Sequence, residues 1–441
     1  MLKRRNMTAV NYRVAAFNVD VTPPLGAQMA YDINKNIDTP IFVRGLILDD
    51  GISRAVIASC DFIYIWGQAW FEWRRAIAKA AGTSAEKVFL HCIHQHDSMR
   101  IAPQWNQLAA RIGTVAVDDE YCRTTLQKLT LAVRAAADGK SQRIRRLMTA
   151  ERRLGWLASN RRIIDKNGNC SAMRFSMCRD PELRALPVGT IDPILRTIAF
   201  AGNGGRIMAA LHFYASHPMA AYRREMVSRD VPGVALDYTS GKYGPGTMNI
   251  YLNGCGGNVT FGKYHLGDKK KSLELLGRRL GKGIVANLEH LEEKPAGKMD
   301  FATAVFDYPL APSITVKSME KVVKKTFNGN RALYLKAVAR LVIARNWNRW
   351  RKCALYRLSL GSDIHILSLP GEMCVEYQLY AQSLVPEKFL ACAAYGNGTY
   401  HYIPTAAMFK EGGYEPGAGI TTPAVEARLK NAISEILHLP E

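Results

Sequence analysis

Residues 87–98 read KVFLHCIHQHDS, a short apolar run that ends in three histidines and an aspartate. The run predicts a buried strand, and imidazole is a common protein ligand of zinc. Side chains alternate along a strand, so His94 and His96 are expected to point the same way, with Gln95 opposite. One histidine would then bind a metal while the other moves protons or acts as a second ligand. Alternatively, these are ordinary polar strand-end residues with satisfied hydrogen bonds.

The composition is that of a large globular protein. The chain has 441 residues, 48% hydrophobic and 22% charged, enough for an extensive core. Its basic first residues precede no apolar signal sequence, and no apolar run reaches the ~18 residues needed to cross a bilayer. Nine cysteines without a CxxC pair indicate reduced thiols. These features predict a cytoplasmic protein.

The charge is strongly positive. Lysine and arginine number 59 against 38 acidic residues, a formal net charge of +21. Residues 317–357 hold twelve Lys/Arg and one acid, Glu320. Such a block attracts an anionic membrane surface, an acidic substrate or nucleic acid, or it is simply a solvated helical face. No zinc finger, RNA-binding aromatic signature or basic zipper accompanies it, so nucleic acid is not favoured.

Strand and helix patterns alternate along the chain, which predicts an α/β fold with mixed β-sheets flanked by helices. We expect one large catalytic domain over residues 1–441, with residues 1–10 flexible. The predicted strands are 9–22, 41–48, 55–60, the apolar run within 87–98 that ends in the histidines, 196–201, 206–213, 248–252, 364–369 and 389–395. The predicted helices are 66–81, 119–138, 269–290, two within 316–350 that break at 328–330, and 423–437.

Polar residues that bind metals or carry protons stand at or just beyond several predicted strands. Sites in α/β sheets gather beyond strand ends, so these side chains could converge on a metal site there. Each has an ordinary explanation by itself, such as a buried histidine bonded to backbone or a core tyrosine. The residues are Asp61, His94, His96, His217, Glu372 and Tyr402.

In this context the chain resembles the catalytic domain of the neutral/alkaline (non-lysosomal) ceramidases. Short motifs carry the resemblance, in the family's order, over nearly the whole chain. They are Asp20-Val21-Thr22-Pro23-Pro24, Ser59-Cys60-Asp61, His94-Gln95-His96, Asn160-Arg161, Ser216-His217-Pro218, Gly257-Asn258-Val259-Thr260, Pro370-Gly371-Glu372, His401-Tyr402-Ile403-Pro404-Thr405 and Tyr414-Glu415.

The resemblance implies a zinc-dependent hydrolase of a C–N amide bond in an N-acyl, lipid-like substrate. The four zinc ligands it implies are His94, His217, Glu372 and Tyr402. Zinc accepts this nitrogen and oxygen set, and it can activate water and polarise the scissile carbonyl. The resemblance further implies catalytic roles for four residues: proton transfer by His96, binding of the carbonyl oxygen or oxyanion by Arg161 and Tyr414, and a hydroxyl at Thr260.

The motifs also depart from the family pattern. Thr260 stands where the family has a serine, and Asn258 where it has an aspartate, so we favour zinc-activated water over a covalent route. Asp97 replaces a small residue after His96 and is a candidate to orient that histidine. The sequence carries no counterpart of the C-terminal β-sandwich of characterised ceramidases. Amide hydrolysis is therefore implied more directly than action on ceramide.

Two other functions remain open. One is a metal-dependent esterase or deacetylase that acts on a small polar substrate. The other is a catalytically silent zinc-containing binding protein that uses its basic block at a membrane surface. Four tryptophans flank the histidine stretch and either line an apolar substrate groove or, more simply, pack in the core: Trp66, Trp70, Trp73 and Trp105.

Overall fold

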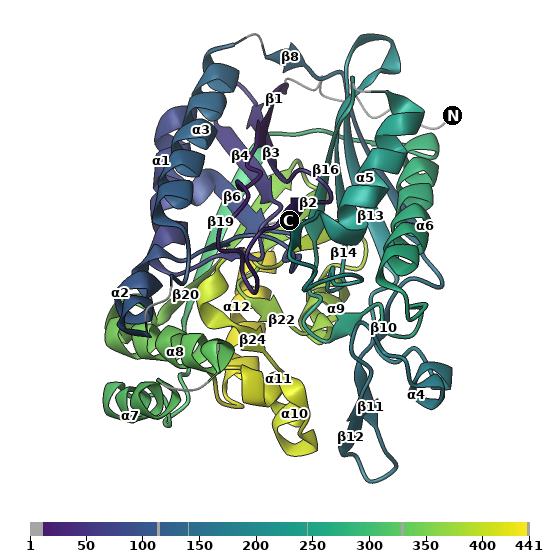
Figure 1. Cartoon of the computed structure of the whole chain (residues 1–441). Helices are drawn as coiled ribbons and strands as arrows, with labels where there is room; N and C mark the ends of the chain where they lie inside the picture. The colour runs from purple at the N-terminus through teal and green to yellow at the C-terminus, as the bar shows by residue number, and fades with distance from the viewer. Residues whose placement is uncertain (1–11, 113–114, 140, 245, 328–329, 439–441) are drawn as a thin grey trace.

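Three larger β-sheets form the body of the molecule in the computed structural model (Figure 1). The structure describes residues 12–112, 115–139, 141–244, 246–327 and 330–438. The first sheet has the order β6 (Val88–Cys92), β4 (Arg54–Cys60), β3 (Phe42–Asp49), β1 (Arg13–Asp20) and β8 (Gln142–Arg143). The second has the order β16 (Met248–Asn253), β14 (Ile207–Tyr214), β13 (Ile194–Ala201), β9 (Arg146–Arg153) and β18 (Glu292–Lys294). The third has the order β19 (Met299–Asp307), β20 (Lys352–Leu360), β21 (Ile364–Ser368) and β23 (Phe389–Ala393).

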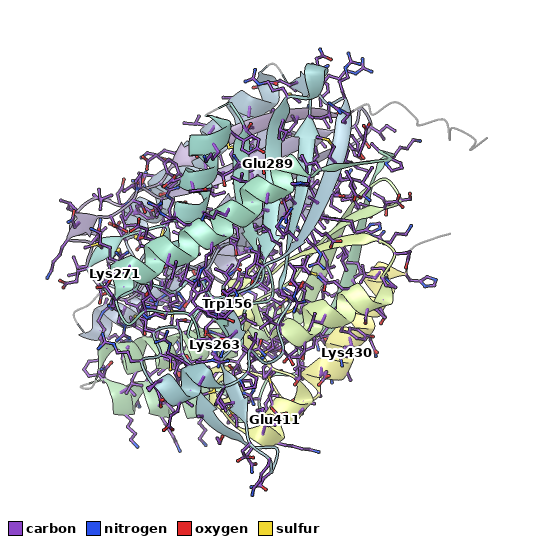
Figure 2. The ribbon with its side chains drawn as sticks, turned by 90° about the vertical axis from the view of Figure 1, so that its right-hand side faces the viewer. Trp156, Lys263, Lys271, Glu289, Glu411 and Lys430 are labelled. Carbon is purple, nitrogen blue, oxygen red and sulfur yellow. The ribbon has the colours of Figure 1, made fainter. Side chains whose placement is uncertain are left out.

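The described residues form the following helices, several of which cover the outer faces of these sheets. They are α1 (Gln68–Ala81), α2 (Asn106–Ala109), α3 (Asp119–Asp138), α4 (Pro181–Ala185), α5 (Asp230–Tyr243), α6 (Lys269–Glu289), α7 (Val316–Thr326), α8 (Arg331–Trp350), α9 (Val375–Leu384), α10 (Ala406–Glu411), α11 (Tyr414–Ala418) and α12 (Val425–Leu437). The pair α1 and α3 lies on one side of the molecule and α5 and α6 on the other (Figure 1). Lys271 and Glu289 mark the two ends of α6 on the face shown in Figure 2. None of the described helices is long and apolar enough to cross a membrane.

The sheets share one apolar interior. Leu46 of the first sheet, Phe200 of the second and Ile366 of the third belong to the same buried cluster. Each side chain is at most 1% exposed. A buried aliphatic or aromatic side chain of this size contributes roughly 1.5–3 kcal/mol, so this shared core fixes the three sheets relative to one another.

Each large sheet combines antiparallel pairing with one parallel pair. The parallel pairs are β4–β6, β14–β16 and β21–β23, and the chain crosses between their strands through α1, α5 and α9. In such units, sites form beyond the carboxyl ends of the parallel strands. Those ends lead directly into the histidine stretch, His217, Glu372 and the loop at Tyr395.

Several two-stranded pairs lie beside these ends and position site residues. They are β5 (Tyr64–Ile65) with β7 (Arg100–Ile101), β10 (Ser159–Asn160) with β17 (Val259–Thr260), β11 (Arg162–Ile164) with β12 (Cys170–Met173), β15 (Met226–Val227) with β2 (Asn36–Ile37), and β22 (Glu372–Met373) with β24 (Tyr402–Ile403).

The predicted α/β fold with mixed sheets flanked by helices is confirmed. The helix at 119–138 has the predicted bounds, and Asp118 caps it by accepting from Tyr121 N. The sequence pattern missed β19 and β20 of the third sheet and the crossover helices α5 and α9. Residues 328–329 of the predicted helix break, and the predicted flexible segment 1–10, lie outside the described residues.

His212 in β14 is a buried histidine in the second sheet whose ionisation can be tested. Its Nδ1 is 3.0 Å from Thr197 Oγ1, and its Nε2 is 3.0 Å from Asn249 Oδ1. Burial lowers the pKa of His212 from its ordinary value of 6.5 to about 4. The neutral ring therefore stabilises the fold fully above about pH 6.5, and this contribution falls as the pH drops toward 4.

We expect His212→Gln to reduce the acid sensitivity of the protein. Between about pH 7 and about pH 5, the wild-type free energy of unfolding should fall by about 2 kcal/mol more than that of the variant. Urea unfolding at both pH values measures the difference. Equal losses in the two proteins would show that His212 does not titrate in this window.

Candidate metal centre and active-site cavity

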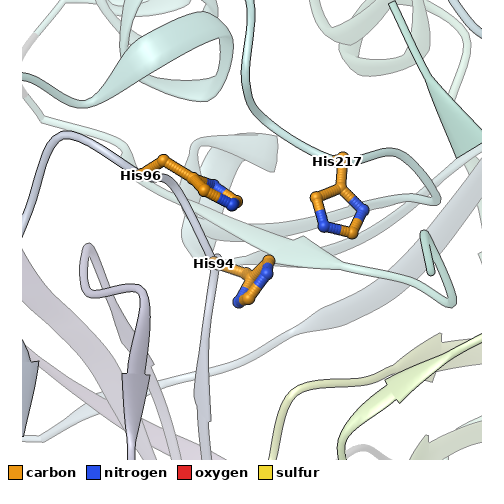
Figure 3. A group of neighbouring side chains, drawn as sticks. All are labelled: His94, His96 and His217. Atoms are coloured by element: carbon orange, nitrogen blue, oxygen red, sulfur yellow. The ribbon is translucent and has the colours of Figure 1, made fainter. Parts of the chain in front are cut away.

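The histidine stretch leaves its strand before the site begins. Strand β6 ends at Cys92, and His94 has φ 66°, a left-handed conformation that is uncommon for a residue other than glycine. The predicted strand alternation of His94 and His96 is therefore wrong. A turn, and not a strand, brings the rings together, with centroids 4.9 Å apart. The rings of His94, His96 and His217 face a common space (Figure 3).

Backbone carbonyls orient two of these rings. His94 Nδ1 lies 2.8 Å from Ile63 O, and His217 Nδ1 lies 2.7 Å from Gly256 O. A carbonyl only accepts hydrogen bonds, so each Nδ1 must be the protonated nitrogen. In each ring Nε2 is the nitrogen left to face the common space. Metal-binding histidines are held in this way.

Glu372 and Tyr402 meet the two histidines from neighbouring strands. The register of β22 and β24 places Glu372 directly beside Tyr402. Glu372 Oε2 is 3.1 Å from His94 Nε2 and 3.4 Å from His217 Nε2. The Tyr402 hydroxyl is 3.1 Å from His217 Nε2. The structure thus brings together all four residues expected to bind zinc.

This arrangement fits a cation. Burial lowers the pKa of His217, so its ring is predominantly neutral at pH 7. The Nε2 lone pair of the neutral His217 ring and the oxygen of Glu372 then face one another at 3.4 Å, which is unfavourable unless a positive charge lies between them. Histidine nitrogens together with carboxylate and phenolate oxygens form a donor set that zinc accepts. Nitrogens of His94, His96 and His217 also lie within 4.8 Å of one another.

Burial and charge set the ionisation of the oxygen donors. Burial raises the pKa of Glu372, but His94 and His217 outweigh this effect and hold it well below its usual value. Burial raises the pKa of Tyr402, and the nearby Glu372 carboxylate raises it further. The Arg161 guanidinium acts in the opposite direction and lowers it. Glu372 is therefore anionic, whereas ionisation of Tyr402 requires an additional positive charge nearby.

His96 lies at the edge of this centre. Its ring centroid is 5.6 Å from that of His217, and it stacks 5.7 Å from the ring of Tyr31. Burial lowers its pKa well below the usual value, and the neighbouring histidines lower it further. Its Nδ1 has no hydrogen-bond partner within the described part of the chain. A neutral, unpartnered imidazole in this position is suited to accept a proton.

Arg161 approaches from the opposite side and is completely enclosed by protein. Its Nε donates to Glu415 Oε1 at 2.7 Å, and its Cζ lies 5.1 Å from the Tyr402 ring and 5.0 Å from the Tyr414 ring. Burial opposes the charge of Arg161, but Tyr402 and Glu415 raise its pKa overall. Its Nη2 is buried without a hydrogen-bond partner among the described residues, so one donor is available for a ligand oxygen.

Glu415 is expected to be essential to this corner of the site. It pairs with Arg161 and, at 2.6 Å, with Arg162, and its side chain is fully buried. Replacing Glu415 by Ala leaves two buried guanidinium groups without their carboxylate, which should cost about 3–5 kcal/mol. Chemical denaturation measures the loss. Glu411→Ala removes a more exposed partner of Arg162 and is the matched control; an equal loss there would contradict the assignment.

The two positions that depart from the family motif have structural neighbours of their own. The hydroxyl of Thr260 donates to Arg174 O at 3.1 Å and accepts from Gly262 N at 3.3 Å. The amide of Asn258 donates to both oxygens of Glu376 at 3.0 Å and accepts from Val375 N at the start of α9. Both side chains are fully buried, and both support backbone around the site.

Two aspartates expected near the centre serve other contacts. Asp97 does not orient His96: its oxygens accept from Arg223 N at 2.7 Å and from Arg224 Nε at 2.9 Å. Asp61 accepts from Phe42 N at 2.9 Å and pairs with Arg44 at 3.4 Å. Both carboxylates neutralise arginines and hold loops in place.

A cavity of about 530 Å³ opens beside the centre. His94, His96, Glu372, Tyr402 and Tyr414 line its inner end, and the first turns of α8 line the other side. Of the four tryptophans, Trp105 lines this cavity, while the other three pack in the main apolar core. Sequence reasoning missed further lining residues, namely Tyr31, Tyr64, Arg100 and Arg223. A signal was present for Arg100, since it is a lone charge in the apolar run MRIA four residues after His96.

Known structures share this architecture. The crystal structure of neutral ceramidase from Pseudomonas aeruginosa matches with a TM-score of 0.73 at 15% sequence identity, over 97% of this chain and 74% of that one. A structure described as ceramidase complexed with C2 matches with a TM-score of 0.72 at 15% identity, over 97% and 75% of the two chains. No protein-family model and no curated protein sequence matches the chain. The fold resemblance inferred from the short motifs is confirmed, and the chain has the neutral ceramidase fold.

Proposed function

We propose that this chain is a zinc-dependent hydrolase that cleaves the amide bond of an N-acyl substrate. The convergence of His94, His217, Glu372 and Tyr402 beside a cavity that three of them line supports this proposal most strongly. The fold shared with neutral ceramidases is consistent with the same reaction class. Zinc held by these four residues would act as a Lewis acid that acidifies water and polarises the scissile carbonyl.

The protein groups around that centre have complementary tasks. His96 accepts a proton from the attacking water and returns it to the nitrogen of the departing amine. The free donor of Arg161, together with the hydroxyl of Tyr414, stabilises the negative charge on the carbonyl oxygen. The products are a carboxylic acid and an amine, so water supplies the oxygen and both protons, and no other reactant is required.

The nucleophile is water in this proposal. The Thr260 hydroxyl already donates to a backbone carbonyl and accepts from a backbone amide, so no histidine activates it. A covalent route would need a base beside that hydroxyl. The placement of Thr260 therefore favours a supporting role over nucleophilic attack.

Metal analysis and a substrate panel test the proposal together. Purified protein should contain about one zinc per chain, measured by plasma emission. It should cleave fluorogenic N-acyl amides, including a short-chain ceramide, and chelation should remove this activity. Preferential cleavage of acyl esters or small acetylated compounds would favour the esterase or deacetylase alternative. Bound zinc without turnover of any compound would favour the silent binding protein, and absence of metal would overturn the assignment.

The basic block gives a separate prediction about membranes. Helices α7 and α8 carry exposed cations together with exposed Phe327 and Leu333, which are 40% and 59% exposed. We expect the protein to float with anionic liposomes at low salt and to dissociate as salt rises, because exposed charges are screened. Neutral liposomes are the control. Flotation that is indifferent to salt and to lipid charge would exclude this role.

A further inference from the structure

Arg100 in β7 is a buried cation that lacks an acidic partner. It is 7% exposed, and its Nη2 donates to Ala30 O at 2.8 Å. The Tyr64 side chain is a hydrogen-bonding neighbour of Arg100, but no described carboxylate lies within ion-pair distance of the buried guanidinium. An unpaired buried guanidinium is costly, and proteins normally provide it with a partner.

Arg100 stands in the wall of the proposed substrate cavity. The parallel register of β5 and β7 places it beside Tyr64. The Tyr64 ring lies 5.8 Å from Arg100 Cζ and 6.1 Å from the ring of His94. One aromatic ring therefore separates Arg100 from the metal centre. On another side, the ring of Trp105 packs 4.9 Å from Arg100 Cζ and helps to fix the guanidinium.

Most of the other charged residues that line this cavity are also cations. Arg223, Arg331 and Lys336 also line it, and the acidic lining residues are Asp32 and Glu372. Glu372 belongs to the proposed zinc ligands, so the remainder of the cavity carries a clear excess of positive charge. A cavity lined by one sign of charge raises the local concentration of ligands of the opposite sign. A neutral ceramide would leave this excess unused.

We propose that the substrate is an anionic N-acyl compound whose carboxylate or phosphate pairs with Arg100, a short distance from the scissile amide. This inference rests on the proposed amide hydrolysis and specifies its substrate class. Guanidinium groups form charge-assisted hydrogen bonds with both oxyanions, and Nε and Nη1 of Arg100, which lie on different edges of the group, are donors that no carboxylate neutralises. Arg223 and Lys336, both exposed, would attract the anion toward the cavity.

A matched substrate series tests the inference. The series consists of three amides of the same fatty acid. They differ only in the amine part, which ends in a carboxylate, a phosphate or a neutral alcohol. Wild-type protein should favour one of the anionic amides in kcat/KM by at least about tenfold over the neutral one. Arg100→Gln should lose about 10- to 100-fold toward that anionic amide, mainly through KM, so that the preference for the anionic over the neutral amide falls by a similar factor. Arg134→Gln on the exposed face of α3 is the matched control.

Binding separates this inference from the proposed reaction. Calorimetry with zinc-loaded His96→Ala protein measures the affinity for each amide without turnover. A preference for anionic amides that Arg100→Gln abolishes supports the inference even if none of the compounds is cleaved. The relative affinities for carboxylate and phosphate identify the group. If Arg100→Gln does not fold, the double variant Arg223→Gln, Lys336→Gln should weaken anion binding about tenfold. Equal or tighter binding of the neutral amide by wild type would overturn the inference.

Discussion

Replacing His217 or Glu372 by alanine is expected to remove the metal and reduce amide hydrolysis by more than about a hundredfold, since loss of even an outer-shell partner of a ligand costs 10- to 100-fold. Both side chains are buried at the point where strands from different sheets meet. Glu372 Oε2 contacts both ligand histidines, so its loss removes the anionic charge of the centre. His217→Ala removes an imidazole whose Nδ1 is already held by Gly256 O.

The two variants need a control for folding and for loss of a buried histidine. His212→Gln serves, because His212 lies on the strand that leads to His217 but bonds to Thr197 and Asn249 within the second sheet. It should keep wild-type zinc content and turnover at pH 7. Zinc content is measured on purified protein and folding by circular dichroism. Folded His217→Ala or Glu372→Ala protein with a full complement of zinc would refute the ligand assignment.

The sequence predicted which residues lie together better than it predicted the backbone geometry that unites them. Hydrophobic patterns located β6, β14 and β21, and the polar residues beyond them do converge. Strand alternation failed at His94, because β6 ends at Cys92 and the backbone turns into a left-handed conformation. No local pattern encodes that turn. It depends on backbone contacts from another segment, such as His94 N donating to Phe62 O.

Position 258 shows that the effect of a residue that departs from a motif can be interpreted only when its contact partner in the structure is known. From the sequence, an asparagine here means the loss of a negative charge near the site. In the structure, the Asn258 amide faces the Glu376 carboxylate, whose pKa is raised by burial. A second carboxylate at position 258 would place acceptor against acceptor without a hydrogen between them. Asparagine is the residue that satisfies both Glu376 and the amide of Val375, and the partner lies more than a hundred residues away.

The elements that were found and those that were missed differ in how clearly the sequence marks their ends. The helix at 119–138 begins at a capping aspartate, which short-range chemistry reveals. Strands β19 and β20 pair with each other across a long insertion that contains α7 and α8, so neither has a turn signal to mark it. Arg100 likewise becomes informative only when the cavity shows that no carboxylate accompanies it.

His96→Ala is expected to separate metal binding from catalysis. The variant should retain zinc, because His94, His217, Glu372 and Tyr402 still converge, but it should lose about 10²- to 10⁴-fold in turnover, the usual contribution of a positioned acid or base. Metal content and kcat on the same preparation provide the measurement. Added imidazole should restore part of the activity if a proton carrier is what the variant lacks.

Measuring zinc content and turnover together in His96→Ala also decides whether His96 is a metal ligand or a proton carrier, because the geometry permits both roles. Its ring nitrogen lies close enough to those of His94 and His217 to complete a three-histidine metal group. The Nδ1 atoms of those two are held by the carbonyls of Ile63 and Gly256 from distant segments, whereas the backbone neighbour of the His96 ring is His94, two residues away, and the geometry of its Nδ1 is looser. Loss of zinc in folded His96→Ala would make His96 a ligand and transfer the proton role elsewhere. Retained zinc with wild-type turnover would remove both roles. Zinc retained with turnover lost, and partly rescued by imidazole, is the result that the contacts of His96 predict.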